Sequence, residues 1–232
     1  MNKKLFRNIV IFGFTVFFTH FIGSKVIHLI FPKNDLPKYV NCTFFEENAN
    51  KMPKVFTNLK KYSPEEYNKV CNAFGNKKMS IENSDELVGR LSNLIVKQYP
   101  KSSDETIIKI ANLSVQTFDL AQSKSEEACL KALNGVNEKI LKEDELFQLM
   151  NEVVVTYNKD MALPTELQVK DELEVIFEKL VSIYGNDLKA WVDPTYVLKD
   201  KTTYCRIARD FHKEAIKNRA INTLRLRYNG DL

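Results

Sequence analysis

The stretch Ser102–Gln122, SSDETIIKIANLSVQTFDLAQ, indicates the fold class of the chain. Its first four residues are serines and acids, which stabilise the start of a helix. Apolar residues then recur three or four positions apart, which places them on one side of a helix. They are Ile107, Ile108, Ile110, Ala111, Val115, Phe118 and Ala121. The stretch therefore predicts an amphipathic helix with one buried face.

Similar helix signals lie on both sides of this stretch. Further helices are predicted where capping residues precede an apolar pattern and where Gly or Pro follows it. Their approximate limits are Ser63 to Gly75, Ser84 to Pro100, Ser125 to Gly135, Lys142 to Lys159, Pro164 to Gly185 and Asp200 to Tyr228. Only seven glycines and seven prolines occur, too few for the many tight turns of a sandwich or barrel. We therefore expect residues 63–232 to form an all-α domain, a single bundle or orthogonal array of six to seven helices.

Two of these helices carry more specific expectations. Residues 153–157, Val-Val-Val-Thr-Tyr, would suit a strand by themselves, but the helical spacing around them favours a helix. The helix that starts at Pro164 is expected to bury one apolar face. That face comprises Leu167, Leu173, Ile176, Phe177, Leu180 and Ile183.

A long apolar segment precedes the domain. Ile9–Phe31 reads IVIFGFTVFFTHFIGSKVIHLIF, and as a helix it would span about 34 Å, against roughly 30 Å of membrane hydrocarbon. Residues 1–31 are therefore predicted to be a retained N-terminal transmembrane helix, a signal-anchor. The alternative is a cleaved signal peptide, which would release a secreted protein after Ser24. A bulky Ile22 stands where cleavage usually needs a small residue, so we favour retention.

The basic residues before the apolar segment predict its orientation. Lys3, Lys4 and Arg7 are expected to stay in the cytoplasm, which places the domain on the periplasmic or extracellular side. Residues 9–31 then make the membrane a partner of the chain. Residues 32–62 are interpreted as a connector, because they contain three prolines and no clean period. Four apolar residues are expected to fasten this connector to the domain: Phe44, Phe45, Val55 and Phe56.

All cysteines follow the apolar segment. They are Cys42, Cys71, Cys129 and Cys205. An even number confined to the exported part is typical of disulfides in an oxidising compartment. We expect at least one disulfide, and Cys129–Cys205 is the preferred pair because it would tie the final helix to the rest of the domain. The alternative is that all four are buried, reduced thiols.

The charges are separated along the chain. The net charge of +4 is carried by residues 1–31, whereas residues 32–200 sum to −5 and residues 201–232 to +5. One hypothesis is a docking surface for an acidic partner or anionic lipid headgroups, made of Arg206, Arg209, Lys213, Lys217, Arg219, Arg225 and Arg227. The alternative is that these residues serve the helix dipole and the packing of the domain. A domain that is neutral overall has little attraction for phosphate, so no nucleic acid is expected.

The sequence lacks the motifs of common enzymes and metal proteins. It contains no His-Glu-x-x-His, Cys-x-x-Cys, phosphate-binding glycine loop or Gly-x-Ser-x-Gly. Cys205 and His212 share one predicted helix, but seven residues separate them by about 10.5 Å, too far for a catalytic pair. We therefore expect no catalytic, metal or cofactor residues.

These observations favour a membrane-anchored, non-catalytic interaction module that works with an unidentified protein partner, as part of an envelope complex. The first alternative is an enzyme whose acid and base residues come from separate helices. Its candidates are the carboxylates of residues 143–145, Asp171, Glu172, Glu174 and Glu178. The second alternative is the secreted, soluble helical binding protein that cleavage would release.

Overall fold

The computed structural model describes residues 39–47, 54–78, 80–133, 143–191, 196, 198 and 200–229. Most of these residues are helical, which confirms the all-α prediction. The predicted anchor, residues 9–31, lies outside the described residues. Among the residues that are described, no helix is long and apolar enough to cross a membrane.

The helices follow one another with short links. The helical elements are α2 (Cys42–Glu47), α3 (Lys54–Tyr62), α4 (Pro64–Phe74), α5 (Ile81–Gln98), η1 (Tyr99–Lys101), α6 (Asp104–Lys124), α7 (Glu126–Leu133), α8 (Glu143–Thr156), α9 (Glu166–Tyr184), η2 (Gly185–Trp191), α10 (Thr202–Lys217) and α11 (Ile221–Asn229). The described chain contains one small sheet, in which β1 (Tyr39–Val40) pairs antiparallel with β2 (Lys77–Lys78).

The buried apolar residues form two cores. The first core is built mainly by α3, α4, α5 and α8, and its largest fully buried side chains include Tyr67, Tyr99 and Met150. The second core is built by α6, α7, α9, α10 and α11 around Phe211 and Ile176. Helix α6 contributes to both cores and therefore joins the two halves of the bundle.

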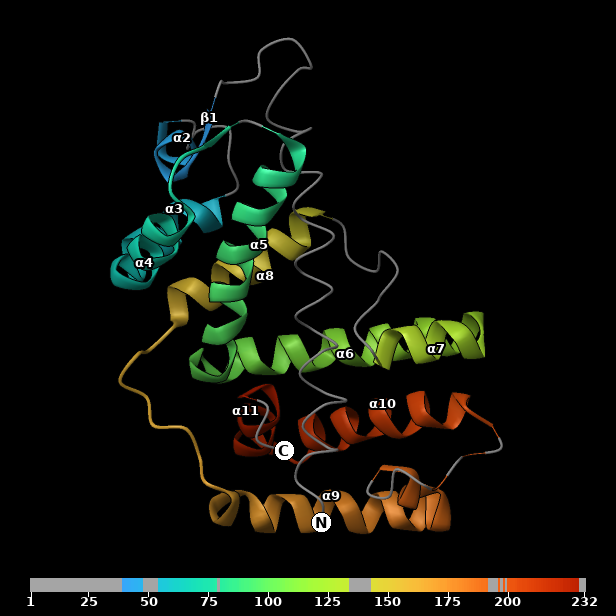
Figure 1. The fold of residues 1–232 in the computed structure, drawn as a ribbon. Coiled ribbons are helices and arrows are strands. Elements are labelled where there is room, and N and C mark those ends of the chain that lie inside the picture. Colours follow the sequence, from blue (N-terminus) through green and yellow to red (C-terminus); the bar gives the residue numbers. More distant parts are fainter. Residues whose placement is uncertain are drawn as a thin grey trace.

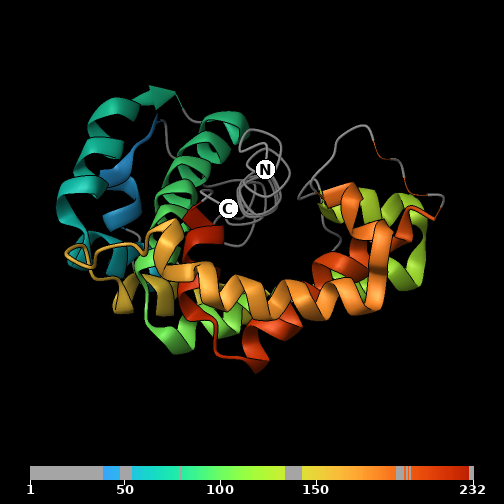
Figure 2. The ribbon, with the colours of Figure 1, turned by 90° about the horizontal axis from the view of Figure 1, so that it is seen from below.

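The second core is a stack of three helical rows. Figure 1 shows α6 continued by α7 in one row, α10 in the next and α9 in the last, all roughly parallel. Helix α10 contacts both α6 and α9 and therefore lies between them. Seen from below in Figure 2, α9 is the outermost of these helices. One long side of α9 consequently faces away from the cores.

The helix starts follow local capping rules, with one correction. Ser103 accepts a hydrogen bond from the backbone N–H of Thr106 and caps α6, as its sequence predicts. Thr165 and Gln168 form a reciprocal capping box at α9. Ser84, in contrast, was expected to cap α5 but is buried within it, and Ser80 provides the cap. Residues 153–156 are helical, as the spacing around them predicts.

The segment interpreted as a connector, residues 32–62, contains two helices. Helix α3 buries Val55, Phe56 and Leu59 in the first core and packs against α8. These three residues have helical spacing, and Pro53 directly precedes α3 in the sequence. The described part of the predicted connector is therefore a component of the folded domain.

The predicted final helix is divided into α10 and α11. The break lies at Asn218–Ala220, where Arg219 has a φ of 51°. This left-handed conformation ends the first helix without a glycine, and the Ala220 N–H then bonds to the Ala215 carbonyl oxygen. The chain turns there and lays α11 against α6, α9 and η1.

The four cysteines form two disulfides, which confirms the disulfide prediction and the preferred pair Cys129–Cys205. Cys129–Cys205 links α7 to α10, with the two Cα atoms 5.7 Å apart. Cys42–Cys71 links α2 to α4, with a Cα–Cα distance of 5.6 Å. Each core therefore carries one disulfide. Two disulfides in a chain of this size indicate a domain of an oxidising compartment.

Candidate functional site

Large exposed apolar side chains gather on α9. Four of the seven found among the described residues belong to this helix: Leu167, Val175, Val181 and Ile183. Leu167 is 81% exposed and Val181 is 53% exposed. Scattered exposed apolar residues are normal, but their concentration on one outer helix makes this face a candidate contact surface.

The buried face of α9 differs from the expected one. Val169, Ile176 and Leu180 are buried, whereas Leu167 and Ile183, which were expected inside, are exposed. Val169, Leu173, Ile176 and Leu180 lie four, three and four positions apart, which is the spacing of one narrow helical face. Leu167 falls outside this register, so it points away from α10.

Glu172 of α9 holds the start of α11. Its Oε2 accepts hydrogen bonds from the backbone N–H of Thr223, at 2.8 Å, and from the Thr223 hydroxyl, at 2.7 Å. Its Oε1 accepts a bond from Asn222. A carboxylate at a helix N-terminus is stabilising, so Glu172 is a capping residue rather than an acid or base.

Three of the predicted docking residues lie at the surface of α10 or just after it. Arg206 bonds to Asp200, at 2.8 Å, and to Thr203. Lys217 is 3.7 Å from Glu214. Arg219 is exposed at the turn before α11. These side chains interact mainly with their own helix or the turn before it.

Arg209 and Lys213 converge on α6. Arg209 bonds to Asp119, at 3.2 Å, and to Asp210, at 2.7 Å, while Lys213 lies 3.7 Å from Asp119. Tyr184 of α9 donates a hydrogen bond to Asp210 at 2.6 Å. Burial opposes ionisation of Asp210, but the bonds from Arg209 and Tyr184 prevail and lower its pKa. This network joins the three helical rows of the second core.

Arg225 and Arg227 are buried, so they do not belong to a docking surface. Arg225 donates to the Pro100 carbonyl oxygen and, at 2.7 Å, to Asp104, which connects α11 to the η1–α6 junction. The guanidinium of Arg227 lies 4.8 Å from the centre of the Phe211 ring. Burial lowers the pKa of Arg227 to about 10, so it remains charged at neutral pH.

His212 lies in the same interior. Its Nδ1 is 2.7 Å from the Ala208 carbonyl oxygen, and its ring packs among Phe118, Phe211 and Tyr228. Burial and the nearby charge of Arg227 lower its pKa from 6.5 to about 3. A neutral imidazole enclosed among aromatic rings packs the core.

We expect the stability of the protein to depend on pH through His212. Below pH 6.5 the histidine of the unfolded chain takes up a proton, whereas folded His212 stays neutral until about pH 3. At pH 5.5 the free energy of unfolding should therefore be lower than at pH 7.5 by about 1.4 kcal/mol from this residue alone. Urea unfolding of the wild type and of His212→Leu, each at pH 5.5 and at pH 7.5, measures this difference in free energy. An equal loss in both proteins would contradict the assignment.

The remaining expectations about chemistry concern Cys205 and the carboxylates. Cys205 is engaged in a disulfide and is therefore not a nucleophile. In the part of the chain that the structure describes, no three His, Cys, Asp or Glu side chains converge as metal ligands would.

Comparison of the chain with protein-family models, curated proteins and solved structures finds no match.

Proposed function

We propose that this protein is a membrane-anchored interaction module that binds another protein through the outer face of α9, outside the cytoplasm. The exposed apolar side chains of α9 carry the proposal, because such residues are a net cost in water unless a partner covers them. The two disulfides support the compartment. In this proposal residues 9–31 hold the domain at the membrane as part of an envelope complex.

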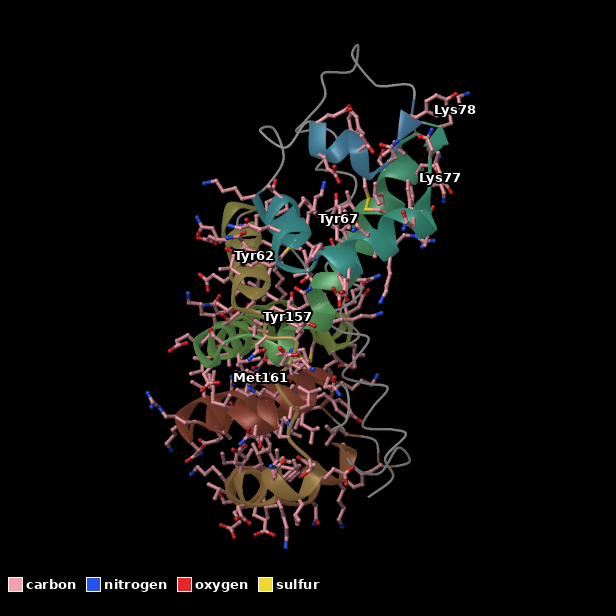
Figure 3. All side chains as sticks on the ribbon, turned by 90° about the vertical axis from the view of Figure 1, so that its left-hand side faces the viewer. Tyr62, Tyr67, Lys77, Lys78, Tyr157 and Met161 are labelled. Carbon is pink, nitrogen blue, oxygen red and sulfur yellow. A yellow bond between two sulfur atoms is a disulfide. The ribbon has the colours of Figure 1, made fainter. Side chains whose placement is uncertain are left out.

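The position of α9 suits this role. Residue 39 begins β1 only eight residues after the end of the proposed anchor, a stretch of at most about 28 Å. Strand β1 pairs with Lys77 and Lys78, and Figure 3 shows these two lysines at one end of the molecule. Figure 1 shows α9 at the opposite end. The anchor would therefore enter at one end of the domain and leave the α9 face free at the other.

The anchor and the orientation have a direct test. Protease added outside intact spheroplasts should remove the domain, and intact mass of the purified protein should include residues 9–31. A mature N-terminus near Lys25 would support the secreted alternative instead. Protection of the domain from external protease, with digestion only after lysis, would contradict the proposed side of the membrane.

A further inference from the structure

A single stripe runs along the outer side of α9. Leu167, Asp171, Glu174, Glu178 and Val181 lie at positions i, i+4, i+7, i+11 and i+14, which share one helical face. All five are exposed, and the stripe is about 21 Å long. It lies opposite the buried face that contains Ile176 and Leu180. We call these five residues the α9 stripe.

The α9 stripe combines apolar ends with an acidic centre. Helix α9 contains five acids and two lysines, and Glu172 is turned towards α11. The other four acids, Glu166, Asp171, Glu174 and Glu178, are exposed, and the last three belong to the α9 stripe. Lys170 approaches Glu174 at 3.6 Å, but both side chains are more than 60% exposed, so the pair offsets little of the negative charge. The flanking Val175, 50% exposed, widens the apolar part of this surface.

The negative charges of the α9 stripe decide which kind of molecule could bind to it. A second copy paired through the α9 stripe, in either direction, would place Glu174 beside its equivalent at the centre of the interface. An antiparallel pair would also set Asp171 near Glu178 of the second copy. Like charges in a desolvated contact are unfavourable by several kcal/mol, so self-association is disfavoured. Anionic lipid headgroups would be repelled in the same way.

We propose that the α9 stripe binds a cationic amphipathic helix of a partner protein. The complementary segment has apolar residues at its two ends, which cover Leu167 and Val181, and lysines or arginines between them. Those basic side chains pair with Asp171, Glu174 and Glu178. This is the recognition of an amphipathic helix by a matching surface, with charge setting the choice of partner. The inference deepens the proposed interaction role by naming the chemistry of the partner.

The test uses the full chain in phosphatidylcholine nanodiscs and two labelled peptides. Both peptides are amphipathic helices of about 18 residues with the same leucines, and one carries lysines where the other carries glutamates. Fluorescence anisotropy should show saturable binding of the lysine peptide and none of the glutamate peptide. Higher salt should weaken the binding, because the charged partners are exposed.

Matched variants locate the binding surface. Reversal of the central charges, Glu174→Lys with Glu178→Lys, should weaken binding of the lysine peptide about tenfold or more. The control reverses two exposed acids that lie outside α9 and away from any helix start, Glu47→Lys with Asp160→Lys, and changes the net charge equally. Leu167→Ser with Val181→Ser should also weaken binding, and circular dichroism should show that each variant stays folded.

The outcomes separate this inference from the proposed function. Absence of lysine-peptide binding, or equal weakening by the control pair, overturns the assignment to the α9 stripe. The protease and mass measurements on the anchor are independent of this result. A domain found on the wrong side of the membrane would remove the proposed anchored role while the peptide binding still stood.

Discussion

Replacement of both Cys129 and Cys205 by alanine is expected to lower the free energy of unfolding by about 4 kcal/mol. The disulfide joins residues that are 76 positions apart, and it therefore restricts a large loop of the unfolded chain. Both cysteines are fully buried, and alanine fits in their place with little loss of packing. Guanidinium unfolding of the two proteins under identical conditions measures the difference.

The other disulfide provides the control for that result. Cys42 and Cys71 are 29 positions apart, so their replacement by alanine should cost about 1 kcal/mol less. A larger loss from the Cys42–Cys71 pair than from Cys129–Cys205 would show that loop length does not set the stabilisation here.

Arg225→Ala should be the most damaging replacement among the seven basic residues of the C-terminal region, with a loss of about 3 kcal/mol. The change removes both hydrogen bonds of the guanidinium and leaves the Pro100 carbonyl oxygen without its charged donor in the interior. Arg225→Lys should recover only part of the loss, because one ammonium does not reproduce the two-armed geometry. Thermal and urea unfolding both report the change.

Arg219→Ala is the matched control for Arg225→Ala. Arg219 belongs to the same basic region but is exposed at the turn before α11, so its replacement should change stability by less than about 0.5 kcal/mol. Equal losses at Arg219 and Arg225 would mean that the buried contacts with Asp104 and Pro100 contribute little.

The features that could be predicted from the sequence are those set by neighbouring residues. Ser103 and Thr165 cap their helices through bonds to residues three positions on, and such signals are visible in the sequence. The pairing of Cys129 with Cys205 followed from the expectation that the final helix needs a link to the rest of the domain. The two short helices before residue 63 were missed because prolines and short length hide a period of only two or three turns.

The features that were missed depend on partners far away in the chain. Nothing near Arg225 shows that its side chain is buried, because its acceptors, Pro100 and Asp104, lie more than 120 positions earlier. The break at Arg219 likewise contains neither Gly nor Pro. The position of Leu167 outside the buried face could have been inferred from the sequence, because the spacing from Val169 to Leu180 excludes it from that face. The exposure of Leu167 to solvent could be established only from the position of α10 in the fold.

The contact of Arg225 with η1 also fixes an order of events during synthesis. The Pro100 carbonyl oxygen and Asp104 leave the ribosome long before residue 225, the last member of this contact to appear. The disulfide of Cys129 likewise cannot form until Cys205 has been synthesised, 76 residues later. The first core can close early around residues 55–154, whereas the second core closes only after Leu224 and Leu226 have been synthesised. Loss of residues 223–232 would therefore remove most of α11 and leave η1, α6 and α9 without the helix that packs against them.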